Sequence, residues 1–491
     1  MRKFRGRVLS HTSIQNAIVR VEEGRVKVED LVKIRGDYYD FIGVIRKVFV
    51  GNPILNRYSP FLVTDPRAAR GMEYTNAVVE LLGILGGGKF EPFVPEPPTT
   101  SSEVVPLDRS DLDLIVSSEN TIYLGYHKYS GWDIPLNPDF LYYHLWIGGI
   151  TGCGKSHTVR ILVDELARIG RRVLVFDHSG RDYVPYFEDK YLVISDTDIV
   201  LDPESVAQAI ASRARFDKWL REYSDSATIL YVLTGGETKM FERVLNSLSR
   251  ENSSETPSVR NANLKSVVWS REKYLKILLK TAKRMGAKGA TPLKLTFKIL
   301  QNVPQDTFRR LNNRAYTYSD IIDLLLSREN CIIIDLSNEI MEIRRNIVAG
   351  ILDELWRRIE TKGEPVDTIV IIDEAQNYAS EGCYPANYTI ARTAREGRKW
   401  GLGLVLASQR WISDVSTDIR SNINSVMFSR LQVATDLQEI GNIVDVGGIE
   451  LGILGAGDFF LAGLLSPFKR PVLLHTYKDP EERLKWRPTR N

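Results

Sequence analysis

The hydrophobic and polar positions divide the chain into three kinds of pattern. Residues 1–90 alternate short runs of Val, Ile and aromatic residues with turn signals at a spacing of about ten residues, which is typical of a small β-barrel or sandwich. From about residue 120 the apolar runs are continuous, as expected for parallel strands that are covered on both faces. Between residues 203 and 328 the strand signals mostly give way to helical spacing, which indicates a helical insertion.

These patterns predict individual elements. In the first region we expect strands at 17–21, 32–34, 41–45 and 47–50. In the second pattern we expect strands at 145–147, 172–177, 331–335, 368–373 and 402–407. In the third we expect helices at 204–223, 274–285 and 319–326.

The domain organisation follows from the same patterns. Residues 91–106 are rich in Pro, Ser and Thr, which indicates an extended linker. The expected order is a β-barrel at 1–90, a linker at 91–119, the first part of an α/β core at 120–202, a basic helical insertion at 203–328, the second part of the core at 329–477 and a C-terminal tail at 478–491.

Charge is segregated along the chain, although the net charge is only +3. Residues 1–90 carry 15 Lys and Arg against 9 Asp and Glu, and residues 238–315 carry 17 against 5. Such basic regions favour a polyanionic partner, and a basic face that is merely solvated is the alternative.

Cysteine spacing and hydropathy favour a cytoplasmic protein. The three cysteines form no CxxC pair, which argues against a zinc site and fits a reducing compartment. Residues 449–468 are the best candidate for a membrane-spanning segment, but Asp458 and several glycines interrupt it, and 459–461 resemble a strand. We therefore expect no membrane segment.

The segment from Gly149 to Ser156 matches G-x-x-x-x-G-K-[ST] at every fixed position. Glycines let backbone N–H groups surround a polyphosphate, Lys155 reaches the β- and γ-phosphates, and the Ser156 hydroxyl binds Mg²⁺. A chance glycine-rich turn is the alternative, and the position between an apolar run and an amphipathic helix counts against it. The motif predicts ATP and Mg²⁺ as cofactors, bound by Gly149, Thr151, Gly152, Cys153, Gly154, Lys155, Ser156 and His157.

A second motif follows the strand at 368–373, which delivers two adjacent carboxylates, Asp373 and Glu374, to its C-terminal end. We expect Asp373 to hold Mg²⁺ together with Ser156, and Glu374 to polarise the water that attacks the γ-phosphate. A solvated acidic loop is the alternative.

Further candidates are an amide and two arginines. Gln409, after the strand at 402–407, is expected to contact the γ-phosphate or the attacking water, and an ordinary loop glutamine is the alternative. Arg398 or Arg395 is expected to reach the active site of a neighbouring subunit and to stabilise the transferring phosphoryl group there. The alternative is that both arginines simply lie at the solvated end of a basic helix. Asp177 either lines the site or forms a turn.

Together these motifs resemble the HerA–FtsK family of hexameric DNA-pumping ATPases. The resemblance covers nearly the whole chain and rests on an N-terminal module similar to the HAS barrel and on the segments 149–156, 177–180, 371–376, 395–399 and 407–410. Cys153 departs from the usual loop composition without replacing a functional group.

The resemblance implies a RecA-like P-loop ATPase core with a helical insertion and a small N-terminal β-barrel. It further implies a homohexameric helicase or translocase with nucleotide between subunits and double-stranded DNA in a central channel. A NurA-type nuclease would dock on the N-terminal module, and the pair would act in DNA-end resection and recombinational repair.

Two other functions stay open. One is a protein-secretion or conjugation motor of related fold. The other is a nucleotide-regulated DNA clamp or scaffold that hydrolyses ATP slowly, against which Glu374 counts, because a pure switch does not need a catalytic carboxylate.

Overall fold

The structure is a computed structural model that describes residues 4–52, 73–115, 120–248, 264–443 and 451–478. It contains two compact units. The first unit comprises residues 1–171 and 403–491, and the second comprises residues 172–402. Each unit is described separately below.

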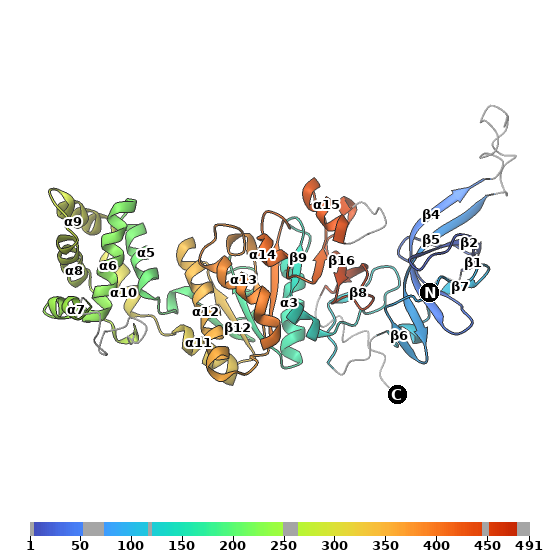
Figure 1. The fold of residues 1–491 in the computed structure, drawn as a ribbon, viewed down its shortest axis with the longest axis horizontal. Coiled ribbons are helices and arrows are strands. Elements are labelled where there is room, and N and C mark those ends of the chain that lie inside the picture. The colour runs from blue at the N-terminus through green and yellow to red at the C-terminus, as the bar shows by residue number, and fades with distance from the viewer. Residues whose placement is uncertain (1–3, 53–72, 116–119, 249–263, 444–450, 479–491) are drawn as a thin grey trace, which may run out of the picture. The chain divides into compact units, whose positions relative to one another are not determined.

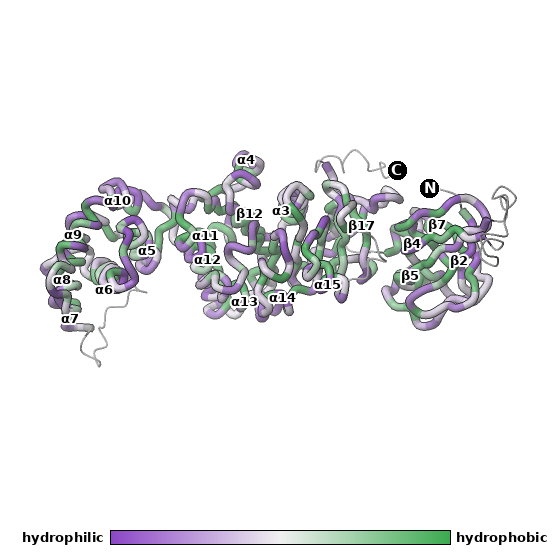
Figure 2. The backbone as a smooth tube through the Cα atoms, turned by 90° about the horizontal axis from the view of Figure 1, so that it is seen from above, coloured by the Kyte–Doolittle hydropathy of each residue, from purple (hydrophilic) through white to green (hydrophobic). Residues whose placement is uncertain are grey.

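The N-terminal part of the first unit is a closed β-barrel, which confirms the predicted architecture (Figure 1). Six antiparallel strands follow one another in the order β2-β1-β7-β3-β4-β5, and β5 pairs again with β2. Apolar side chains fill the interior, and Figure 2 shows hydrophobic segments along β4 and β5. The strands are β1 Arg5–Val8, β2 Asn16–Glu23, β3 Leu31–Ile34, β4 Asp40–Gly51, β5 Tyr74–Gly86 and β7 Glu103–Pro106, and β6 Lys89–Glu91 extends the sheet beside β5.

Strand β7 lies within the range expected to be a linker. It pairs with β1 on one side and with β3 on the other, and Val104 is fully buried in the barrel. Its two consecutive valines have strand propensity, which the surrounding Pro, Ser and Thr residues obscured in the sequence. The two runs expected at 41–45 and 47–50 form one strand, β4, whose register against β5 shifts between Ile45 and Lys47.

The rest of the first unit is a sheet with the strand order β14-β9-β15-β16-β17-β8. Strands β14, β9 and β15 are parallel to one another, and the pairs from β15 to β8 are antiparallel. Helix α3, Lys155–Arg168, follows β9. The strand expected at 459–461 is confirmed as β16. The strands are β8 Gly125–His127, β9 Leu145–Gly148, β14 Leu402–Ser408, β15 Ser425–Phe428, β16 Asp458–Gly463 and β17 Val472–Thr476.

The second unit contains four parallel strands in the order β11-β12-β10-β13. The side chains of β10, β12 and β13 are buried along nearly the whole length, as the continuous apolar runs predict, whereas β11 is mostly only partly buried. The strands are β10 Arg172–Asp177, β11 Leu192–Ser195, β12 Cys331–Asp335 and β13 Thr368–Ile372, and the helices beside them include α4 Val184–Phe187, α12 Met341–Lys362 and α13 Ala386–Glu396.

The helical insertion is confirmed between β11 and β12. The single helix expected at 204–223 is instead two helices, α5 and α6, because the chain turns at Arg215, which has a φ of 52°, and Asp217 is the N-cap of α6. The helices are α5 Pro203–Arg213, α6 Lys218–Thr234, α7 Phe241–Leu248, α8 Arg271–Arg284, α9 Thr291–Asn302, α10 Gln305–Asn312 and α11 Tyr318–Ser327. None of the helices in the described residues has an apolar stretch long enough to cross a lipid bilayer.

Candidate nucleotide-binding loop and carboxylate cluster

The glycine-rich loop connects a buried strand to a helix in the first unit. All four residues of β9 are buried, and α3 begins at Lys155 with Gly154 as its N-cap. Gly149, Gly152 and Gly154 have φ values of 149°, 78° and 107°. Side chains disfavour these angles, so the loop needs glycine to curl at the helix N-terminus, where its N–H groups can face an anion.

Close packing on one side and open space on the other shape this loop. A Cβ atom on Gly149 would lie 2.7 Å from Cys153 Sγ, and one on Gly154 would lie 3.3 Å from Gly457 N. A Cβ atom on Gly152 would have no described atom within 4 Å. The loop is therefore closely packed at Gly149 and Gly154 and open beside Gly152.

Lys155 lies against the loop that it follows. Its side-chain amino group donates hydrogen bonds to Gly149 O at 2.7 Å and to Ile150 O at 3.4 Å, and only 8% of the residue is exposed. The cation is thus held beside the loop, from where it can exchange carbonyl oxygens for phosphate oxygens. Ser156 is half-buried in the first turn of α3.

His157 and Cys153 brace the loop. His157 Nε2 lies 2.6 Å from Tyr477 O, directly after β17, and Cys153 O accepts a hydrogen bond from Gly457 N. Both contacts join the predicted nucleotide-binding segment to the antiparallel side of the sheet.

Gln409 lies at the same sheet edge as the loop. Strand β14 pairs in parallel with β9 so that Ser408 is opposite Gly148. Gln409 and Gly149 are therefore the residues that directly follow this pair, each on its own strand. The N–H of Gln409 donates to Asp414 Oδ2 at 3.1 Å, which fixes its backbone, and its side chain is exposed.

In the second unit, three neighbouring strands end in carboxylates. Asp177 ends β10 and pairs with Asp335, which ends β12. Phe176 pairs with Ile372, so Asp373 follows β13 beside Asp177. This is the edge at which ligands bind in open α/β sheets.

Asp373 is the most strongly perturbed of these groups. Only 2% of it is exposed, and its Oδ2 atom has no hydrogen-bond partner among the described residues. Burial, and then the negative charges of Glu374 and Asp182, raise the pKa of Asp373 to about 7. Such an orphaned, buried carboxylate oxygen fits a metal ligand.

Asp182 joins this cluster, although the sequence reasoning did not select it. One carboxylate oxygen from each of Asp177, Asp182 and Asp373 lies within 4.8 Å of the others. The available signal was its place in Asp-His-Ser-Gly-Arg-Asp, directly after β10.

Asp177 forms the turn that follows β10. Its two oxygens accept hydrogen bonds from the Ser179 hydroxyl and from the backbone N–H groups of Ser179, Gly180, Tyr183 and Val184. Asp177 therefore has the turn role, since it fixes the loop at 178–184, and it also lies close to Asp373.

Glu374 has a strained backbone. Its φ and ψ are 46° and 49°, in the left-handed region, and its side chain accepts a hydrogen bond from Gln376 Nε2. A residue other than glycine in this region costs free energy, and such strain concentrates at functional sites.

Arg395 lies in the last turn of α13, and Arg398 lies in the short helix Gly397–Trp400 that follows. Both side chains are exposed. They are accessible to another molecule.

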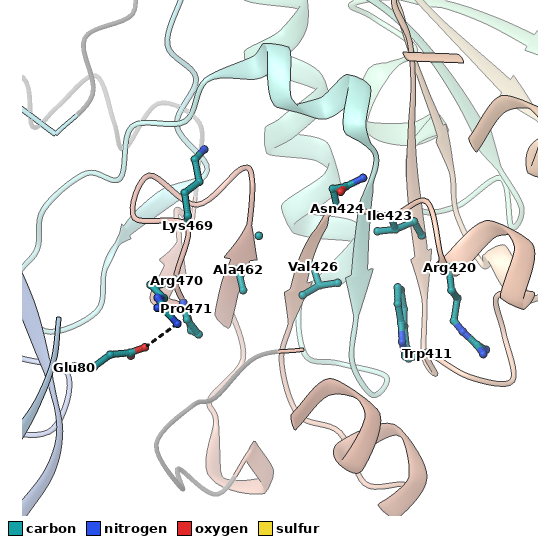
Figure 3. A pocket seen from close by; sticks show the side chains of 11 residues that line it. Glu80, Trp411, Arg420, Ile423, Asn424, Val426, Ala462, Lys469, Arg470 and Pro471 are labelled. Atoms are coloured by element: carbon teal, nitrogen blue, oxygen red, sulfur yellow. Dashed lines mark ion pairs between the residues drawn. The ribbon is translucent and has the colours of Figure 1, made fainter. Parts of the chain in front are cut away.

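A separate cavity of about 190 Å³ is lined mainly by residues near the ends of β15 and β16 that lie away from the glycine-rich loop, and also by Trp411, which follows β14 (Figure 3). Asn424 precedes β15 and Gly463 ends β16, whereas the loop leaves the other end of β9. Figure 3 shows Glu80 of the barrel facing Arg470, and their charged atoms are 3.9 Å apart. No residue of the glycine-rich loop is among those that line this cavity.

Comparison with known proteins finds a family model that matches the middle of the chain and several similar proteins. Residues 122–355 match the model of the central domain of the helicase HerA. The DNA double-strand break repair helicase HerA of Saccharolobus solfataricus is 24% identical over 98% of this chain and 95% of its own. That of Sulfurisphaera tokodaii is 25% identical over 82% of this chain and 79% of its own.

Among solved structures, VirB4 of Thermoanaerobacter pseudethanolicus resembles the chain with a TM-score of 0.51. It covers 75% of this chain and 99% of its own, at 14% sequence identity. At that identity the likeness concerns the fold alone.

Proposed function

We propose that this chain is a member of the HerA family and an ATP-driven motor that translocates along double-stranded DNA during the repair of broken DNA ends. The observation that carries the proposal is the edge shared by β9 and β14. There the loop with Lys155 leaves one strand, and Gln409 follows the paired position on the next. An amide at the end of that strand is suited to detect or position the group that ATP hydrolysis removes.

Each residue has a distinct role in the proposed hydrolysis. The loop N–H groups and Lys155 bind the phosphates, and Ser156 and Asp373 hold Mg²⁺, which neutralises the developing charge when bound. Glu374 accepts the proton of the attacking water, and Gln409 orients that water or the γ-phosphate.

We further propose that six copies form a ring with nucleotide between subunits. The exposed positions of Arg398 and Arg395 support a role in the site of the neighbouring copy. The NurA-type nuclease would dock on the barrel, which contains no candidate metal cluster among its described residues. Native mass spectrometry with ATP and duplex DNA tests the ring. A pull-down with a chain that begins at residue 107 tests the docking, and retained nuclease binding would contradict it.

DNA binding is proposed to be electrostatic and nearly independent of sequence, because a motor must hold every base step that it passes. The basic surplus of the insertion supports this. On α8, Lys280 and Lys283 are exposed, and Arg284 is also exposed but forms an ion pair with Glu242 at 3.4 Å. Combined neutralisation of Lys280, Lys283 and Arg284 should lower the salt dependence of duplex binding. If the dependence of duplex affinity on salt concentration were unchanged, the DNA-binding surface would lie elsewhere in the protein.

The central test is ATP turnover with and without duplex DNA. We expect stimulation by duplexes of unrelated sequence and loss of both nucleotide binding and turnover in Lys155→Ala. Slow turnover that DNA leaves unchanged would instead favour a nucleotide-regulated clamp. Turnover stimulated by a protein substrate and not by DNA would favour a secretion-type pump.

A further inference from the structure

We propose that Asp182 and Asp373 together bind one divalent cation, so that Asp182 is an additional ligand for the Mg²⁺ of this motor. The proposal deepens the proposed function and rests on it only for the identity of the cation. Asp182 and Asp373 both belong to the second unit.

The distances between the carboxylates suit a single ion. Oxygens of Asp177, Asp182 and Asp373 lie within 4.8 Å of one another. Mg²⁺–oxygen bonds of about 2.1 Å place opposite ligands about 4.2 Å apart, and the ion commonly takes one or two carboxylates and keeps several waters. Two of these side chains can therefore hold Mg²⁺ after a small adjustment.

Hydrogen bonding distinguishes the two ligands from the third carboxylate. Five donors occupy the oxygens of Asp177, as described above. Asp182 accepts one hydrogen bond within the described residues, from Ser179 Oγ at 2.9 Å. Asp373 Oδ2 is buried without a partner, which is costly for a carboxylate unless an ion is to occupy the position.

Charge also favours a cation. In the described part of the chain, no Lys, Arg or His side chain forms an ion pair with Asp182 or Asp373, and Glu374 adds a further negative charge nearby. Like charges this close repel each other. A cation bound between the carboxylates attracts each of them and so offsets this repulsion.

The loop that carries Asp182 is fixed by its neighbours. Asp177 accepts hydrogen bonds from the backbone N–H groups of Gly180 and Tyr183, which lie on either side of Asp182 in the chain. Tyr183 is also fully buried. A ligand held in place by such contacts loses little freedom when an ion binds.

The test measures Mn²⁺ binding to the full chain without nucleotide, by the loss of the free Mn²⁺ signal in electron paramagnetic resonance. We expect one bound ion, and affinity weakened about tenfold or more in both Asp182→Asn and Asp373→Asn. Asp189→Asn, which changes an exposed acidic residue seven positions along, should bind Mn²⁺ as the parent does.

A second measurement controls for folding. Asp182→Asn can still accept the Ser179 hydrogen bond and relieves repulsion, so without metal it should melt no lower than the parent chain. Added Mg²⁺ should raise the melting temperature of the parent and leave that of the variant nearly unchanged.

Two outcomes would overturn the proposal: no Mn²⁺ binding to the parent chain at millimolar concentration, or equal affinity in Asp182→Asn. Both are independent of ATP turnover. A chain that binds Mn²⁺ through Asp182 but hydrolyses no ATP would keep the cation site and refute the proposed motor.

Discussion

Ser408 and Gly148 are paired in the neighbouring parallel strands β14 and β9. Their pairing places Gln409 and Gly149 at equivalent positions beyond the same sheet edge, although 260 residues separate them in the chain. The pairing of these two strands therefore places Gln409, with its side-chain amide, close to the proposed nucleotide-binding loop.

Gln409→Ala should lower ATP turnover by about 10²-fold and leave ATP binding nearly unchanged, because the amide stabilises charge that develops during the reaction. Steady-state turnover and the affinity for a fluorescent ATP analogue measure the two effects. Gln301→Ala, at an exposed position of α9, is the matched control. Equal loss of binding and turnover would instead make Gln409 an ordinary nucleotide contact.

Glu374→Gln should bind ATP and fail to hydrolyse it, because an amide cannot accept a proton. Glu374→Gly should be equally inactive but no less stable than the parent chain, because glycine adopts the left-handed backbone of this position without strain. Turnover and thermal unfolding separate the two effects, with exposed Glu381→Gln as the control. Turnover at the parent rate in Glu374→Gln would refute the assignment.

Asp373 should make the stability of the metal-free chain depend on pH. Its pKa rises from 3.8 in the unfolded chain to about 7 in the folded one, so between these values the folded chain binds the extra proton. This contribution to stability is complete below about pH 4 and is lost as the pH rises through about 7.

The free energy of unfolding of the parent chain, relative to that of Asp373→Asn, should therefore fall by a few kcal/mol between about pH 5 and pH 8 in a chelator. Denaturant titrations at several pH values measure it. A difference that is constant with pH would show that Asp373 titrates normally.

A shared active site predicts complementation between two inactive variants. Arg398→Ala should lower turnover by about 10³-fold or more if the arginine acts on the neighbouring site, and Lys155→Ala disables the nucleotide-binding half. In mixed rings some interfaces receive both intact halves and regain activity. Mixtures that never exceed the sum of the two variants would exclude Arg398 in this role, and Arg395→Ala is then tested in the same way. Lys399→Ala is the exposed control.

Arg46 joins the barrel to the sheet of the first unit. It forms buried ion pairs with Glu29 and Glu80, and its second guanidinium nitrogen donates to Pro471 O at 2.7 Å. Arg46→Met leaves Glu29 buried without a cation and should destabilise the chain by about 3–5 kcal/mol.

The double variant Arg46→Met with Glu29→Gln should recover part of that loss, because it removes the uncompensated charge. Thermal or denaturant unfolding measures both, and Lys47→Met, at the exposed neighbouring position, should have little effect. If the single variant were as stable as the parent chain, the ion pairs would carry no net stabilisation.

The amino-acid sequence by itself determined the elements whose signals are local. The continuous apolar runs at 172–177, 331–335 and 402–407 coincide with β10, β12 and most of β14, because strands buried on both faces must be apolar throughout. The glycine-rich loop could also be predicted from the sequence, because the positive φ angles of Gly149, Gly152 and Gly154 favour glycine at each position separately.

Tertiary structure alone decided which distant residues meet. Val104 became part of the barrel through pairing with β1 and β3, although its surroundings have the composition of a linker. Asp182 became a candidate ligand only because parallel register and the turn at Asp177 bring it near Asp373, 191 residues further along the chain. Strand pairing and loop packing depend on contacts between segments far apart in the chain, and no local pattern of residue types specifies them.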